Sequence, residues 1–124
     1  MPTLQDMLDA AHAAVPKISP ADAAALVENS GAVIVDIRDG TEVAASGKAK
    51  GAIAIPRGSL ESRACPTSAT YVASLRQDKP VILYCAGGNR AALAGKTLLE
   101  LGYTDVRNLG GFRDWVAGGG EVEK

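Results

Sequence analysis

Apolar residues near the start of the chain recur every three or four positions, which is the spacing of one face of an α-helix. Thr3 can cap the helix that this pattern predicts. The apolar positions are Leu4, Met7, Leu8, Ala11 and Val15. A second helix is predicted to begin at Ser19-Pro20, because serine is a good cap and proline fits the first helical turn. It should end near Ser30-Gly31, since glycine tolerates the left-handed conformation of a helix end.

Short apolar runs follow, without the alternation of a half-exposed strand. The run at 33–36 predicts a strand that is buried on both faces, and further strands are predicted at 52–55, 81–84 and 106–108. Helices are expected at 41–46, 69–75 and 91–101, and through Phe112 and Trp115. The chain from Gly118 onward is glycine-rich at its start and is expected to be frayed.

Buried strands that alternate with helices are typical of an α/β fold with a parallel sheet. We expect a central, mostly parallel sheet of about five strands with helices on both faces. One domain should cover residues 1–124, with an N-terminal helix at about 3–15, a core at about 17–118 and a short C-terminal tail. Ligands of such sheets bind beyond the carboxyl ends of the strands. Asp36 and Cys85 both lie at such ends.

The charge and the composition narrow the classes of function. The 124 residues carry a formal net charge of −1, which gives no general attraction to nucleic acid or to acidic membranes. The chain has no apolar run of the roughly 18 residues that would span a bilayer, and no secretory signal, so a cytoplasmic protein is expected. The two cysteines lack the clustered ligands of a zinc site, and no metal or organic cofactor is expected.

The segment from Cys85 to Arg90 is the candidate site. Cys85 ends a predicted strand, and two glycines behind it allow successive backbone N–H groups to turn inward as an anion-binding nest. The helix that follows adds the positive end of its dipole, and Arg90 adds a formal charge. These three effects favour a thiolate at Cys85. The only histidine, His12, lies far back in the first helix and is expected at the surface, so a Cys–His hydrolase lacks an obvious base.

The spacing of Cys85 and Arg90 distinguishes two chemistries. Four residues lie between them, whereas protein tyrosine phosphatases have five in the equivalent loop. A shorter loop makes a smaller pocket, which suits one extra sulfur atom on the cysteine better than a phosphoryl group.

Four segments in register resemble the rhodanese family, over about residues 17–118. They are Val33-Ile34-Val35-Asp36-Ile37-Arg38, Gly51-Ala52-Ile53-Ala54-Ile55-Pro56, Tyr84-Cys85-Ala86-Gly87-Gly88-Asn89-Arg90 and Leu109-Gly110-Gly111-Phe112 with Trp115. The resemblance implies a single-domain sulfurtransferase in which Cys85 takes a sulfur atom from thiosulfate or a persulfide and passes it to cyanide or a thiol.

The same resemblance assigns roles to individual residues. The loop residues would hold the persulfide, Arg90 would also attract the donor, and Asp36 would support the loop through hydrogen bonds. From the sequence alone, Asp36 could equally cap a turn at the end of its strand, and Arg38 could either pair with an acid or line the pocket. The loop residues are Ala86, Gly87, Gly88, Asn89 and Arg90. The expected partners are a small sulfur donor and acceptor, with a protein or thiol acceptor also open. Neither nucleic acid nor membrane is expected as a partner, and the oligomeric state is left open.

The chain departs from the family pattern at three positions. Ala91 stands where the family often has serine or threonine, and Lys48 and Ala54 stand where it often has histidine. Cys65 matches no family motif, and it is either an incidental thiol or a resolving cysteine. Arg57 and Arg63 are expected to be solvated charges with at most a minor role in attracting anions. A sulfur carrier or docking module, and a phosphatase or arsenate reductase, are the alternative functions.

Overall fold

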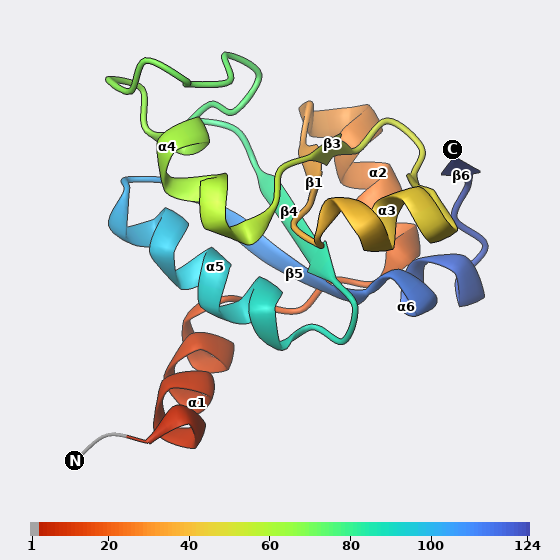
Figure 1. Ribbon diagram of the computed structural model, residues 1–124, viewed down its shortest axis with the longest axis horizontal. Helices are drawn as coiled ribbons and strands as arrows, with labels where there is room; N and C mark the ends of the chain where they lie inside the picture. The colour runs from red at the N-terminus through yellow and green to blue at the C-terminus, as the bar shows by residue number, and fades with distance from the viewer. Residues whose placement is uncertain (1–2) are drawn as a thin grey trace.

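The computed structural model describes residues 3–124 and shows a four-stranded parallel sheet at its centre (Figure 1). The strand order is β3-β1-β4-β5. The strands are β1 (Val33–Asp36), β3 (Ile53–Ala54), β4 (Val81–Cys85) and β5 (Val106–Gly111). A separate antiparallel pair is formed by β2 (Lys48–Ala49) and β6 (Val122–Glu123).

Six α-helices and one short 3-10 helix surround the sheet within the described residues. They are α1 (Leu4–Ala14), α2 (Pro20–Ser30), α3 (Gly40–Ser46), η1 (Arg57–Ser59), α4 (Leu60–Ala64), α5 (Asn89–Glu100) and α6 (Phe112–Ala117). None of the helices in residues 3–124 is long and apolar enough to cross a membrane.

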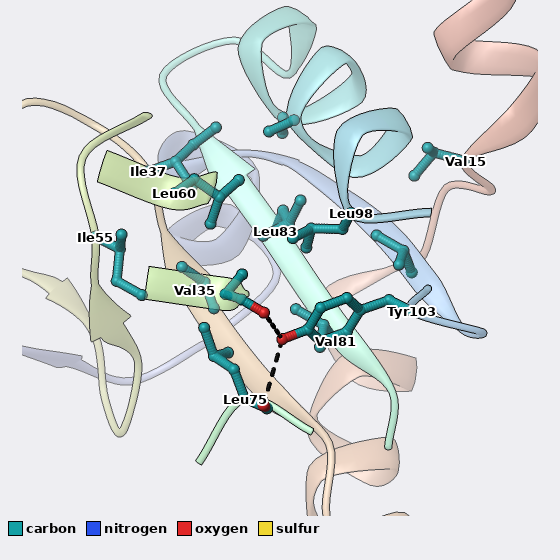
Figure 2. Close-up of a cluster of buried hydrophobic side chains, with 14 of the residues drawn as sticks. Val15, Val35, Ile37, Ile55, Leu60, Leu75, Val81, Leu83, Leu98 and Tyr103 are labelled. Atoms are coloured by element: carbon teal, nitrogen blue, oxygen red, sulfur yellow. Dashed lines mark hydrogen bonds between the residues drawn. The ribbon is translucent and has the colours of Figure 1, made fainter. Parts of the chain in front are cut away.

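Side chains alternate between the two faces of the sheet, and each face has its own core. Val81, Leu83 and Cys85 of β4 pack with α4 and α5, whereas Ile82 and Tyr84 pack with α2 and α6. Figure 2 shows the first of these cores. The expected α/β fold with helices on both faces is confirmed. The sheet has four strands rather than about five, because the two remaining strands pair with each other.

The local signals for the first two helices are confirmed. Thr3 accepts a hydrogen bond from the Asp6 N–H, and the Asp6 carboxylate accepts one from the Thr3 N–H, so α1 begins with a full capping box. Ser19 caps α2 with a single hydrogen bond, which its hydroxyl accepts from the Asp22 N–H, and Gly31 ends that helix with a φ of 67°.

No helix forms at 69–75, where one was expected. The segment is instead a series of turns, and Leu75 is buried in the core. The Tyr103 hydroxyl donates to the carbonyls of Ala64, at 2.7 Å, and Leu75, at 3.3 Å (Figure 2). Burial raises the pKa of Tyr103 to about 12, so its hydroxyl keeps the proton that it donates. A side chain distant in sequence therefore satisfies two backbone carbonyls, one at the end of α4 and one at the end of this segment.

The C-terminal residues are folded, in contrast to the frayed tail that was expected. The Trp115 indole N–H donates to the Glu121 carbonyl at 2.7 Å, and β6 pairs with β2. Gly120 lies directly on the Trp115 ring, since a Cβ atom there would be 2.1 Å from the indole. Trp115 itself is 5% exposed, as expected for the anchor of α6.

Gly95 lets α5 pack closely against two elements at once. A Cβ atom at this position would lie 2.9 Å from both Cγ atoms of Val15 and 3.2 Å from Val106 Cγ1. The branched Val15 side chain is fully buried, so it has little freedom to move aside.

We predict that Gly95→Ala destabilises the protein by about 1 kcal/mol, measured by urea unfolding. Overpacking costs about 1–3 kcal/mol, and alanine's better helix propensity offsets about 1 kcal/mol of this. Gly58→Ala is the control, because no atom lies within 4 Å of a Cβ there, and its change should stay within about 0.5 kcal/mol. Equal stability of the two variants would contradict the packing role of Gly95.

Candidate active site

Cys85 lies at the carboxyl end of β4, at the base of the loop that leads into α5. Its side chain is 1% exposed, and its Sγ accepts a hydrogen bond from the Gly88 N–H at 3.0 Å. Gly88 has a φ of 100°, a left-handed conformation that favours glycine, and it forms the N-cap of α5. The loop therefore folds back over the sulfur atom, as the two glycines predicted.

Several backbone donors of this loop have no partner among residues 3–124. Within residues 3–124, no acceptor is bonded to the backbone N–H groups of Gly87, Asn89, Arg90 and Ala91. Three of these groups belong to the first turn of α5, whose dipole is positive at that end. The loop thus offers unpaired donors to an anionic group carried on Cys85 Sγ.

The end of β5 supports the loop from behind. Asn108 is 2% exposed; its Nδ2 donates to the Gly88 carbonyl at 3.1 Å, and its Oδ1 accepts from the Gly110 N–H at 2.8 Å. A Cβ atom at Gly111 would lie 2.2 Å from the Ala86 carbonyl oxygen. Glycine at position 111 is therefore required for the loop to rest on the backbone of β5.

Sequence reasoning did not identify Asn108 as part of the site. An amide in a strand that is otherwise buried on both faces is a usable signal, because a buried amide must find hydrogen-bond partners. The partner could not be named, since Gly88 is brought to Asn108 only by the pairing of β4 with β5.

The Arg90 side chain reaches across the loop to Glu42 of α3. Its Nη1 lies 3.2 Å from Glu42 Oε1, and its Nη2 lies 3.3 Å from each carboxylate oxygen. Hydrogen bonding to Arg90 lowers the pKa of Glu42, and the same bond raises the pKa of Arg90. Glu42 was not a candidate from sequence, because only the tertiary structure brings α3 to this loop.

Arg90 also lines a cavity of about 280 Å³ beside α5. The cavity has three basic side chains, from Arg57, Arg90 and Lys96, together with Met7, Leu93, Thr97 and Glu100. Arg57 is thus placed with Arg90, whereas Arg63 is exposed and does not line this cavity. Arg57 donates to Glu61 at 2.8 Å and to Thr97 at 3.3 Å, so its charge is partly compensated.

Asp36 and Arg38 lie on the face of the sheet opposite to Cys85. Strand pairing places Asp36 beside Tyr84, and the Tyr84 hydroxyl donates to Asp36 Oδ2 at 2.6 Å. Arg38 donates to both oxygens of the same carboxylate, at 3.0 Å and 2.8 Å. Asp36 Oδ1 also accepts from the Arg38 N–H at 3.0 Å, so Asp36 caps the turn at the end of β1 and makes no hydrogen bond to the Cys85 loop. Of the two roles open for Arg38, the structure shows the ion pair.

This buried network supports the loop indirectly, through α3. The Arg38 guanidinium also donates to Ser46 Oγ at 2.8 Å and to the Gly47 carbonyl at 2.7 Å, and so holds the end of α3. Burial by itself lowers the pKa of Arg38, but the hydrogen bonds and ion pair with Asp36 raise it above the usual value. The anchored α3 then presents Glu42 to Arg90.

Comparisons with known proteins identify the family of this chain. A family model described as the rhodanese-like domain matches residues 19–118. The chain belongs to the rhodanese family.

Among the relatives of this rhodanese-like domain, thiosulfate sulfurtransferase GlpE of Pseudomonas putida (strain GB-1) is 33% identical over 102 residues, covering 82% of this chain and 84% of that protein. Uncharacterized protein YqhL of Bacillus subtilis (strain 168) is 36% identical over 93 residues, covering 74% of this chain but only 64% of that longer protein. A solved structure from Rhodopseudomonas palustris, described as a protein of unknown function and possible tyrosine phosphatase, has a TM-score of 0.88 at 39% identity, covering 99% and 96% of the two chains.

The three departures from the rhodanese pattern have clear positions in the structure. Ala91 is fully buried at the first turn of α5, so it adds no hydroxyl donor to the loop. Lys48 donates to the Ala52 carbonyl at 2.7 Å and pairs with Glu123, which ties β2 to β6. Ala54 is exposed at the edge strand β3.

Cys65 and His12, which the sequence analysis also considered, lie at different distances from the Cys85 loop. Cys65 ends α4, and hydrogen bonds with Thr67 lower the pKa of its thiol. Both cysteines are free thiols. His12 is half-buried rather than at the surface, and its Nε2 lies 3.4 Å from Asn89 Oδ1, beside the loop from which it was expected to be far.

We predict that Asn108→Ala destabilises the protein by about 2–4 kcal/mol in urea unfolding. The Gly88 carbonyl and the Gly110 N–H would each lose their partner, and an unsatisfied buried polar group costs about 1–3 kcal/mol. Asn29→Ala, an exposed change on α2, is the control and should shift stability by no more than about 0.5 kcal/mol. A loss below about 1 kcal/mol for Asn108→Ala would mean that the loop does not depend on this amide.

Proposed function

We propose that this rhodanese-like domain is a sulfurtransferase that carries sulfur as a persulfide on Cys85. The observation that carries the proposal is the loop around Cys85 Sγ, with its unpaired N–H groups at the start of α5. A relative that is 33% identical is named thiosulfate sulfurtransferase, which favours the same chemistry for this chain. Small sulfur donors and acceptors are the partners that follow from it.

The reaction consists of two displacements at sulfur. The Cys85 thiolate attacks the outer sulfur of thiosulfate, the S–S bond breaks, and sulfite leaves with the electron pair. A thiolate or cyanide then attacks the outer sulfur of the persulfide, and Cys85 leaves as the thiolate. Electrons and atoms balance without an oxidant or a cofactor. The chemistry needs Cys85 as a free thiol, which a reducing compartment such as the cytoplasm provides.

The residues of the site have three different roles. The N–H groups of Gly87, Gly88, Asn89 and Arg90 hold the negative charge of the persulfide, as fixed dipoles aimed at a developing anion do. The basic cavity that contains Arg57, Arg90 and Lys96 attracts the anionic donor. Asp36 and Arg38 are positioning residues, because they hold α3 rather than the reacting atoms.

Intact-mass measurement tests both half-reactions. Purified protein mixed with thiosulfate should gain the mass of one sulfur atom, and cyanide should then remove it. Cys85→Ser should gain nothing because it lacks the nucleophile, while Cys65→Ser, the matched control, should load fully. Turnover that survives in Cys85→Ser would overturn the assignment. Stoichiometric loading with slow turnover on small donors would instead indicate a sulfur carrier that delivers to a protein.

The pair formed by Glu42 and Arg90 should set the affinity for thiosulfate. Glu42→Gln keeps the helix cap but removes the charge that competes for Arg90, so KM should fall about 2–5-fold. Arg90→Ala should raise KM. Both constants come from steady-state kinetics with thiosulfate and cyanide, and an unchanged KM in both variants would show that Arg90 does not contact the donor.

A phosphatase is the second candidate, because the structure from Rhodopseudomonas palustris is described as a possible tyrosine phosphatase. Only four residues separate Cys85 from Arg90 here, so the loop is short for a phosphoryl group. Hydrolysis of an aryl phosphate that disappears in Cys85→Ser, together with no sulfur loading from any sulfane donor, would favour this candidate.

A further inference from the structure

Helix α1 lies outside the residues that match the family model, yet it is firmly attached to the domain. The match covers residues 19–118, and α1 ends at Ala14. Ala11 and Val15 are fully buried, and the Val15 methyl groups fill the space that Gly95 leaves on α5. The first turns of α1 project away from the rest of the fold, while its last turn lies against α5 (Figure 1).

The last turn of α1 brings His12 to the outer side of the Cys85 loop. His12 Nε2 lies 3.4 Å from Asn89 Oδ1. Both residues line a cavity of about 420 Å³ with Lys17, Gly87 and Gly88. His12 Nδ1 is inaccessible, and it has no hydrogen-bond partner among the described residues. The Nδ1 side of the imidazole is therefore packed against the protein, while Nε2 faces Asn89.

Side chains from other elements hold the Cys85 loop at two points, and the Asn89 side chain bonds to His12. Asn108 holds the Gly88 carbonyl, and Glu42 holds the Arg90 side chain. Asn89 lies between these two points, and its exposed side chain makes no other hydrogen bond within residues 3–124. Its backbone N–H is one of the unpaired donors at the start of α5.

We propose that His12 is a positioning residue, which holds Asn89 so that its N–H stays directed at the group carried on Cys85. Because an amide oxygen only accepts, the His12 nitrogen that faces it carries the hydrogen. Donors that are preorganised around a developing anion stabilise it more than mobile ones do. That His12 assists sulfur transfer rests on the proposed function. That His12 helps to stabilise the Cys85 thiolate does not rest on it.

Two substitutions separate the hydrogen bond from the packing of the helix. In His12→Gln the terminal amide nitrogen can replace Nε2 as the donor. In His12→Leu the side chain has no donor, and leucine still favours the helix. Gln5→Leu is the matched control on α1, because Gln5 is exposed and bonds only to Asp9 of the same helix.

Steady-state kinetics with thiosulfate and cyanide provide the first readout. We expect kcat of His12→Leu to fall about 2–10-fold with little change in KM, since one hydrogen bond is lost and the basic cavity is intact. His12→Gln and Gln5→Leu should keep most of the wild-type kcat. Asn89→Ala should show the same loss as His12→Leu, and the double variant should lose no more than either one.

Alkylation of Cys85 by iodoacetamide, in a Cys65→Ser background, provides a readout that needs no sulfur donor. His12→Leu should slow this alkylation by a factor similar to its fall in kcat, and His12→Gln should not slow it. Slowed alkylation in a protein that never loads sulfur would support the positioning role and overturn the sulfurtransferase. Wild-type values in His12→Leu, equal losses in the Gln and Leu variants, or losses that multiply with Asn89→Ala would each overturn the positioning role.

Discussion

Two opposite charges lie in the interior at the carboxyl end of β1, and the arrangement around the site depends on how they are compensated. Asp36 is fully buried and Arg38 is 5% exposed, so a missing partner would leave a strongly destabilising buried charge. Each nitrogen of the Arg38 guanidinium donates a hydrogen bond, and the ring of Phe112 lies 4.3 Å from its centre. These contacts join β1, the end of α3 and the start of α6. The position of α3 in turn allows Glu42 to reach the Cys85 loop.

The sheet separates the structural network from the reactive group. Alternation along β4 directs Tyr84 into the network and Cys85 to the opposite face, one residue later. Burial, and then the hydrogen bond to Asp36, raise the pKa of Tyr84 far above its usual range, so this hydroxyl stays a donor. The Cys85 sulfur accepts from the Gly88 backbone N–H, and no acidic side chain of the described part of the chain bonds to it. This division suits a site whose chemistry depends on keeping an anionic sulfur inside a loop.

The sequence predicted the local elements well and the contacts between distant elements poorly. Caps at Thr3, Ser19 and Gly31 were correct because they depend on a few neighbouring residues. Turns replace the helix expected at 69–75, and Tyr103, distant in sequence, donates to the carbonyl of Leu75 at the end of this segment. The folded tail depends on Trp115 in the same way, since the indole N–H holds the chain that leads into β6.

What the sequence determined by itself was the α/β class, the place of Cys85 between a buried strand and a helix, and the glycines that let the loop close over the sulfur. These follow from hydrophobic periodicity and from the steric freedom of glycine, which act over a few residues. The tertiary structure alone decided that Asn108 supports the loop, that Glu42 competes for Arg90 and that His12 reaches Asn89. Each of these contacts joins residues at least 20 positions apart. Such contacts exist only after strand pairing and helix packing have brought their elements together, and no local pattern in the chain encodes them.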